Sequence, residues 1–289
     1  MIPRDFDSLV STDWLAQHLI DPAIRIVDMR GYVTTKQVEP GVEEATYRGA
    51  LAEYQTSHVP GSVYVDWTLD IIDPKDPVSV QLASPECFGA AMSERGIGDD
   101  SHVIVVDHMG GQFATRLWWA LKAYGHDKVS VLDGGWNRWV EDGYEVTDQA
   151  TIMHPAQFTP RYQPQWRVTA EELCGQLGTT GLQLLDARDF GQYSATRRRG
   201  PRGGHIPGAI NLPREIFFAE GGGFRPLAEI RKILADRGLK PDQPTIAYCN
   251  GGVAATVLLF NLDRLGFRPL ANYDGSWNEW AARLDLPVA

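Results

Sequence analysis

The chain has 289 residues, of which 43% are hydrophobic and 22% charged, a composition typical of a globular protein rather than a disordered or fibrous one. It carries 27 Lys and Arg against 37 Asp and Glu, so its net charge of -10 has the wrong sign for binding nucleic acid or an anionic membrane surface. The length exceeds what one hydrophobic core usually organises, so we expect two domains.

The N-terminal segment predicts a protein that stays inside the cell. Arg4, Asp5 and Asp7 fall where a secretory signal would need an unbroken apolar run, and no apolar stretch approaches membrane-spanning length. The three cysteines are too few and too unevenly spaced for a disulfide framework or a Cys-x-x-Cys metal site. We therefore expect a cytoplasmic protein with no membrane partner, no nucleic acid partner and no bound metal.

The chain contains an internal repeat. Residues 10–19, a predicted helix, resemble residues 168–177, and each copy then runs into a predicted strand that ends in Asp-x-Arg. Further along, His58-Val-Pro-Gly matches His205-Ile-Pro-Gly. The distance along the chain between these two motifs is shorter than that between the two Asp-x-Arg segments, so the first copy has an insertion between Arg30 and His58. Insertions usually lie in loops, and we expect a loop here.

The second part of each copy contains a strand, a glycine-rich loop and a helix. Predicted strands at residues 103–107 and 245–249 are followed by predicted helices at residues 114–124 and 255–265, and then by an Asp-Gly-x-Trp segment. This alternation predicts an α/β fold, with a mainly parallel sheet covered by helices on both faces in each half. The tryptophans of these segments have helical spacing, which favours core packing: Trp136, Trp139, Trp277 and Trp280.

The two halves are predicted to be separate domains. Residues 151–167 contain three prolines and little periodicity, which is typical of a linker. The next segment begins with Thr169-Ala-Glu-Glu, a capping box that starts a helix. We therefore predict an N-terminal domain over residues 1–150, a linker over 151–167 and a C-terminal domain over 168–289.

Cys249 is the strongest candidate for chemistry. It follows an apolar strand and precedes Gly251 and Gly252 and then a helix, at the sheet edge where open α/β sheets bind ligands. Glycines allow backbone N–H groups to turn toward the sulfur, and the helix N-terminus adds partial positive charge, so both features favour the thiolate. The alternative is an inert buried cysteine, which would not need the two glycines. The repeat places Asp107 at the equivalent position.

The other cysteines and other cysteine chemistries are weaker candidates. Cys87 and Cys174 are expected to be core residues. A cysteine phosphatase needs an arginine six residues after the cysteine, and this chain has Ala255 there. A Cys-His protease pair with His205 is conceivable, but His205 is better explained by its own turn motif.

The order and duplication of these motifs resemble the tandem-domain rhodanese and 3-mercaptopyruvate sulfurtransferase family over essentially the whole chain. The shared marks are the two Asp-x-Arg strands, the two His-x-Pro-Gly turns, Trp118-Trp119 leading to Tyr124-Gly-His, and the two Asp-Gly-x-Trp segments. The resemblance implies two tandem rhodanese-like domains and a sulfurtransferase that needs no cofactor. It also implies that the N-terminal domain, with Asp107, is non-catalytic.

The resemblance further implies that Cys249 is the catalytic residue and forms a persulfide. The persulfide would be cradled by the loop that follows it: Asn250, Gly251, Gly252, Val253, Ala254 and Ala255. The sulfur would come from a small anionic donor, with thiosulfate favoured and 3-mercaptopyruvate as the alternative, and would pass to cyanide, a thiol or a thioredoxin-like protein. An alternative of another class is a low-turnover sulfur carrier or binding module. A monomer is expected.

Donor binding is where the sequence departs from the family pattern. Members of this family bind the donor anion with an Arg-aromatic pair, and the matching pair here is Gln192-Tyr193, which lacks the arginine. We expect Arg199 or Arg202 to replace it, because a local cluster of arginines suits an anionic substrate; the alternative is a solvated basic loop. Three further residues are expected to support the loop without touching the donor: Asp186, Arg188 and His205.

Overall fold

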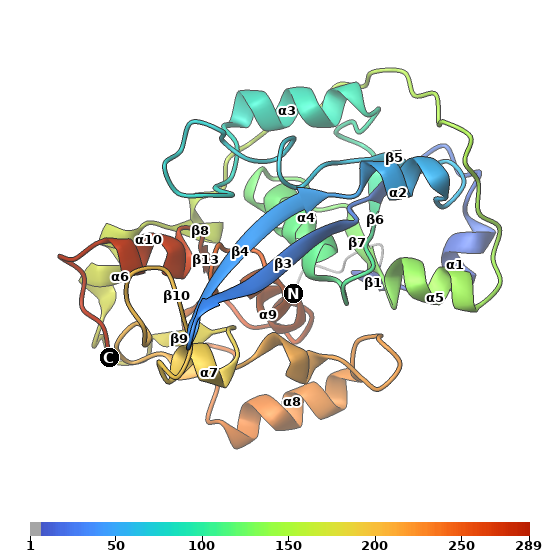
Figure 1. The fold of residues 1–289 in the computed structure, drawn as a ribbon. Coiled ribbons are helices and arrows are strands. Elements are labelled where there is room, and N and C mark those ends of the chain that lie inside the picture. Colours follow the sequence, from blue (N-terminus) through green and yellow to red (C-terminus); the bar gives the residue numbers. More distant parts are fainter. Residues whose placement is uncertain (1–6) are drawn as a thin grey trace.

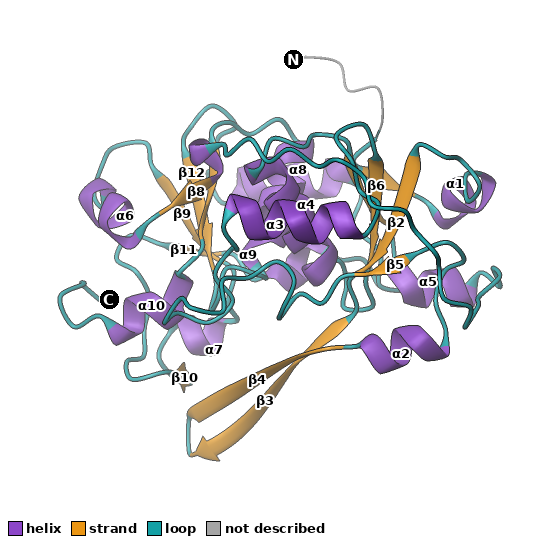
Figure 2. Ribbon diagram, turned by 90° about the horizontal axis from the view of Figure 1, so that it is seen from above, coloured by secondary structure: helices purple, strands orange, loops and turns teal. Residues whose placement is uncertain are grey.

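The computed structural model describes residues 7–289, so Arg4 and Asp5 lie outside the described residues. Each half of the chain forms a five-stranded sheet in which every pairing is parallel, with strand orders β1-β7-β6-β2-β5 and β11-β9-β12-β13-β8. Helices cover both faces of each sheet (Figures 1 and 2). The predicted α/β fold with two similar halves is confirmed.

The N-terminal sheet and its helices alternate along the chain. Its strands are β1 (Leu9–Val10), β2 (Ile24–Asp28), β5 (Val63–Tyr64), β6 (His102–Val106) and β7 (Val129–Leu132). Its helices are α1 (Thr12–Gln17), α2 (Leu51–Thr56), α3 (Pro85–Glu94), α4 (Gln112–Ala123) and α5 (Gly135–Glu141).

The C-terminal half repeats this order. Its strands are β8 (Arg167–Val168), β9 (Gln183–Asp186), β11 (Ile210–Asn211), β12 (Thr245–Tyr248) and β13 (Leu270–Tyr273). Its helices are α6 (Ala170–Gln176), α7 (Phe190–Tyr193), α8 (Leu227–Asp236), α9 (Ala255–Arg264) and α10 (Ser276–Ala282), with short 3-10 turns at Pro164–Trp166 and Arg214–Phe217. The capping box at the start of α6 forms as predicted.

The main core lies between the two sheets and runs across both halves. It joins residues of α4 such as Trp118 to residues of α9 such as Phe260, whose rings meet edge to face with centroids 5.2 Å apart. The hydroxyls of Thr115 and Thr256, at equivalent positions of the repeat, lie 2.9 Å apart on the same two helices. Two smaller cores lie on the outer faces of the sheets. Burial of one continuous apolar core holds the halves together.

The insertion between Arg30 and His58 is a β-hairpin, not the loop expected from the sequence. Strands β3 (Gly31–Glu39) and β4 (Val42–Gly49) pair in antiparallel fashion, and α2 follows them. The hairpin extends away from its own domain, and β4 pairs in parallel with β10 (Arg198–Arg199) of the C-terminal half (Figure 2). Along β4, the half-buried Ala45 and Tyr47 alternate with the exposed Glu44, Thr46 and Arg48, which is the period-2 pattern of a strand with one buried face.

The remaining expectations about local structure meet mixed outcomes. Residues 151–163 contain no helix or strand, whereas Arg167, expected in the linker, already pairs in the second sheet. Three of the four tryptophans are fully buried, and Trp136 is half-buried: it packs against the outer core of the N-terminal sheet and also stacks on the Arg30 guanidinium. Cys87 is exposed on α3 and Cys174 is half-buried, so the expectation of a core position is wrong for Cys87. No helix within residues 7–289 is long and apolar enough to cross a membrane.

Candidate active site

Cys249 lies at the carboxyl end of β12, in the middle of the C-terminal sheet. All four residues of β12 are buried, and Cys249 itself is 4% exposed. Its N–H donates to the hydroxyl of Ser276 at 3.1 Å, and its carbonyl accepts the N–H of Trp277 at 3.0 Å. Both partners belong to the start of α10, so the Asp-Gly-Ser-Trp segment anchors the residue that the sequence singles out.

The two glycines after Cys249 are required by close approach of neighbouring groups. Gly252 has a φ of +71°, and a Cβ there would lie 2.7 Å from the backbone carbonyl oxygen of Asp274. A Cβ at Gly251 would lie 2.9 Å from the side chain of Val80, which comes from the other domain. Side chains at these positions would therefore push the loop out of its present path.

The equivalent loop of the N-terminal domain shows what this loop geometry does. The carboxylate of Asp107 accepts four backbone N–H groups: those of Met109 and Gly111 at 2.9 Å on Oδ1, and those of Phe113 at 2.7 Å and Ala114 at 2.9 Å on Oδ2. Successive N–H groups thus converge on one anion at the start of α4. The loop is a cradle for a negative charge placed on the side chain at its first position.

In the C-terminal loop a thiol takes the place of that carboxylate. Trp136 donates its N–H to the carbonyl of Asp107, just as Trp277 donates to Cys249, so the two loops are anchored alike. Among residues 7–289, no protein acceptor receives the backbone N–H groups of residues 250–254. These N–H groups are available to an anionic sulfur on Cys249.

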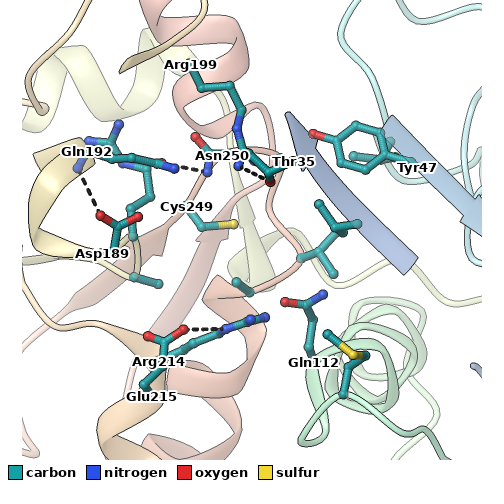
Figure 3. Close-up of a pocket in the computed structure, with 18 of the residues that line it drawn as sticks. Thr35, Tyr47, Gln112, Asp189, Gln192, Arg199, Arg214, Glu215, Cys249 and Asn250 are labelled. Atoms are coloured by element: carbon teal, nitrogen blue, oxygen red, sulfur yellow. Dashed lines mark hydrogen bonds and ion pairs between the residues drawn. The ribbon is translucent and has the colours of Figure 1, made fainter. Parts of the chain in front are cut away.

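A cavity of about 200 Å³ opens in front of Cys249, and both domains line it. Figure 3 shows Cys249 between Arg199 and Asn250 on one side and Arg214 and Gln112 on the other. The hairpin contributes Thr35 and an apolar wall, which Met109 extends from the N-terminal cradle. We call this cavity the active-site pocket. Its apolar residues are Val33, Tyr47, Trp67, Val80, Met109, Ala187, Val253 and Ala254.

Arg199, one of the two arginines expected to bind a donor anion, lines the active-site pocket. Its side chain is 14% exposed, and its guanidinium donates to the hydroxyl of Thr35 at 3.0 Å. The Nε atom of Arg199 is buried without a hydrogen-bond partner. Arg199 therefore keeps a donor group that no protein atom uses, next to the pocket.

Arg202 lies elsewhere, and its expected role as an anion contact is corrected. It is not among the residues that line the active-site pocket. Its guanidinium instead donates to four backbone carbonyls at the end of α10 and beyond it, those of Trp280, Ala281, Arg283 and Leu286. Carbonyls at a helix C-terminus lack intrahelical partners, so Arg202 stabilises the end of α10 and uses four of its five N–H donors there.

Asp186 and Arg188 form a buried ion pair, and Arg188 also lines the active-site pocket, whereas Asp186 does not. The Arg188 guanidinium donates to both carboxylate oxygens of Asp186, with a shortest distance of 2.6 Å, and to the carbonyl of Gly204 at 2.8 Å. Tyr248, which precedes Cys249, donates its hydroxyl to Asp186 at 2.7 Å, and burial raises the pKa of that phenol well above its usual value. The Asp186–Arg188 ion pair is therefore linked to Cys249 through Tyr248, the residue that precedes Cys249 in the chain.

His205 is not among the residues that line the pocket in front of Cys249. Its ring stacks on Tyr193 at a centroid distance of 3.8 Å, and its Nδ1 lies 3.0 Å from the Tyr193 carbonyl. No histidine lines the active-site pocket within residues 7–289, which removes the basis for a Cys-His pair. His205 fixes the turn after β10 against α7.

Several pocket residues were not predicted from the sequence. Arg214 follows β11, and its Nε donates to Glu215 at 3.0 Å. Its position just beyond the end of a strand in the same sheet is a signal that could have found it. Gln192, where the family pattern has arginine, accepts a hydrogen bond from Asn250 at 2.9 Å. Thr35 gave no such signal, because only the hairpin brings it across the domain boundary.

Comparisons with known proteins agree with this geometry. A family model described as the rhodanese-like domain matches residues 11–142 and 169–283. The 3-mercaptopyruvate sulfurtransferase of Escherichia coli K12 is 36% identical over 282 residues, which cover 96% of each chain. The thiosulfate sulfurtransferase of Rattus norvegicus is 34% identical over 288 residues, which cover 96% of this chain and 93% of the rat protein.

Solved structures give the same result. The crystal structure of a 3-mercaptopyruvate sulfotransferase from Escherichia coli superposes with a TM-score of 0.82 at 32% sequence identity, over 94% of this chain and 99% of that one. The tandem repeat, the cradle loops and these matches together establish that the chain belongs to the rhodanese-like family, as a two-domain member similar to the 3-mercaptopyruvate and thiosulfate sulfurtransferases.

Proposed function

We propose that this protein is a sulfurtransferase that carries sulfur as a persulfide on Cys249. The observation that carries the proposal is the cradle at Asp107, in which four N–H groups hold an anion at the first position of a loop that the C-terminal domain repeats with Cys249. A persulfide has its negative charge on the terminal sulfur, and a ring of N–H groups stabilises such a charge without a metal. The activities named for the relatives agree with this reading.

The first step loads the sulfur. The Cys249 thiolate attacks the outer sulfur of the donor, a new S–S bond forms, and the bond between that sulfur and the rest of the donor breaks. With thiosulfate the electron pair leaves with sulfite; with 3-mercaptopyruvate it leaves with the carbon as the enolate of pyruvate, which then takes up a proton. The N–H groups of Asn250, Gly251, Gly252, Val253, Ala254 and Ala255 hold the resulting persulfide.

The second step unloads the sulfur. A nucleophilic acceptor attacks the terminal sulfur, and the electron pair of the S–S bond returns to Cys249 as the thiolate. Cyanide, a small thiol or a thioredoxin-like protein supplies the nucleophile. Because the first product leaves before the acceptor reacts, ping-pong kinetics are expected. No side chain needs to remove a proton from Cys249 once it is a thiolate.

The sulfur donor is a small anion that binds beside Arg199. This side chain lines the active-site pocket and has an unpaired Nε–H, and a guanidinium binds a carboxylate or sulfonate group well. Thiosulfate and 3-mercaptopyruvate are the two candidates, as in the names of the relatives. Asp186 and Arg188 support the loop through Tyr248, and His205 supports it through the turn before β11.

Intact-mass measurement after incubation with each donor tests the proposal. The protein is expected to gain one sulfur atom with at least one donor and to lose it again on addition of cyanide. The Cys249→Ser variant should gain none, while Cys87→Ser, a change at an exposed cysteine, should behave as wild type. Loading of the Cys249→Ser variant, or no loading of the wild type, would overturn the proposal. Loading without turnover would identify the low-turnover carrier instead.

We also propose that the protein acts as a monomer in the cytoplasm. One chain supplies both walls of the active-site pocket, and its two halves share a continuous core, so catalysis needs no second copy. Sedimentation at micromolar concentration measures the assembly state, and a dimer would contradict the first part of this proposal. Cell fractionation tests the second part.

A further inference from the structure

The hairpin carries one acidic side chain into the arginine cluster next to the active-site pocket. In the parallel pairing of β4 with β10, Glu43 is the partner of Arg199. Glu43 is 9% exposed, although it belongs to a strand whose other glutamate, Glu44, is exposed. The hairpin thus extends from the N-terminal domain across the C-terminal domain (Figure 1) and places a negative charge there.

Glu43 contacts three residues of the C-terminal domain. Its Oε1 lies 2.6 Å from the guanidinium of Arg197, and its Oε2 lies 3.9 Å from that of Arg199. The same Oε2 accepts a hydrogen bond from the amide of Gln192 at 3.2 Å. Gln192 in turn accepts from Asn250, the residue after Cys249, at 2.9 Å. Glu43 is therefore connected both to the anion-binding arginine and to the cradle.

These contacts balance the charge of the arginines around the pocket. Arg188 is paired with Asp186, Arg214 with Glu215, and Arg199 with Glu43. An anion that binds beside Arg199 therefore also feels the negative charge of Glu43 behind it. The repulsion doubles when the anion carries a second negative charge, so it penalises a dianion more than a monoanion.

We propose that Glu43 is a positioning residue that selects sulfur donors by their charge, in favour of singly charged ones. This inference rests on the proposed function. At pH 7, thiosulfate is a dianion, whereas 3-mercaptopyruvate carries one charge on its carboxylate. One additional unit charge within about 12 Å, at an effective dielectric constant of about 20, changes the relative binding of such donors by at least about tenfold. The hairpin makes the N-terminal domain a determinant of donor choice.

The experiment compares kcat/KM for thiosulfate and 3-mercaptopyruvate in wild type and in Glu43→Gln. The amide keeps the shape of the side chain and removes its charge, so the thiosulfate to 3-mercaptopyruvate ratio should rise at least about tenfold, mainly through a lower KM for thiosulfate. Glu44→Gln makes the same change on the exposed face of the same strand and should leave the ratio within about twofold of wild type.

A second variant predicts a change of the opposite sign. Arg197→Gln removes a cation that pairs with both Glu43 and Asp189, which leaves more negative charge facing Arg199, so the ratio should fall. A general loss of structure would not move the two variants in opposite directions. If Glu43→Gln fails to fold, Arg197→Gln and the double variant Arg197→Gln/Asp189→Asn decide, because a fall that persists in the double variant comes from Glu43. Ratios within twofold of wild type in every folded variant would overturn the inference, whereas a wild-type protein that gains no sulfur would overturn the proposed function.

Discussion

Arg116 and Asp274 form a buried ion pair between the two domains. A substitution that removes one member of this pair tests whether the pair stabilises the folded protein. Both side chains are 1% exposed, and the guanidinium lies 2.5 Å from the Asp274 carboxylate. Arg116 also donates to the carbonyl of Val80 at 2.8 Å and to that of Gly252, in the cradle loop, at 3.2 Å. Asp274 accepts the N–H of Leu82 at 2.9 Å as well.

The substitution Arg116→Met keeps much of the side-chain length and removes the charge. It leaves Asp274 buried with only Arg167, at 3.2 Å, as a charged partner. The Val80 carbonyl loses its hydrogen bond from Arg116, whereas the Gly252 carbonyl still accepts the side-chain amide of Asn272 at 2.9 Å. Loss of one member of a buried pair typically costs about 3–5 kcal/mol, because the remaining charge stays desolvated. We expect a loss of that size in the free energy of unfolding, and weaker persulfide formation because Gly252 loses a contact.

Urea unfolding followed by tryptophan fluorescence measures this loss. A single transition is expected for the wild type, because one core is continuous between the halves. Lys232→Gln is the matched control, since it breaks an exposed i,i+4 pair with Asp236 and should cost less than about 0.5 kcal/mol. A loss below about 1 kcal/mol for Arg116→Met would refute the reasoning, as it would mean that the pair is not desolvated.

Three further predictions address the two cradle loops and the half-buried His102. Asp107→Ala removes an acceptor of four N–H groups and should lower the free energy of unfolding by at least about 3 kcal/mol. The folded variant should still gain sulfur on Cys249. A folded variant that gains none would contradict a non-catalytic role for Asp107. Gly252→Ala should destabilise more than Gly208→Ala, since both residues have positive φ but only Gly252 has atoms in the way of a Cβ; equal losses in thermal unfolding would argue against this. Burial lowers the pKa of His102 from its usual 6.5 to about 4, so between these pH values the unfolded state binds more protons than the folded state. The free energy of unfolding should therefore fall as the pH drops from about 6.5 to about 4. Urea unfolding at several pH values measures this slope, which should become flatter in His102→Gln.

The sequence by itself was sufficient for the alternation of strands and helices in the two sheets and for the choice of Cys249 as the candidate reactive residue. Strands and helices alternate because their hydrophobic patterns do, and these patterns are local. Cys249 could be identified because a strand, two glycines and a helix start are adjacent in the chain, and strand ends of a parallel sheet meet at one edge. The repeat then supplied the comparison with Asp107.

Only the tertiary structure decided how the pocket is completed. Arg199 and Arg202 are three positions apart in one basic run, and nothing local separates a pocket arginine from one that caps α10. The destination of the hairpin, and with it the place of Thr35 and Glu43, depends on how the two sheets pack across their shared core. Local patterns specify which face of an element is buried. The contacts between residues more than a hundred positions apart depend on where those faces meet. The sequence could therefore predict the arginine cluster, but not that Arg199 lines the pocket while Arg202 caps α10.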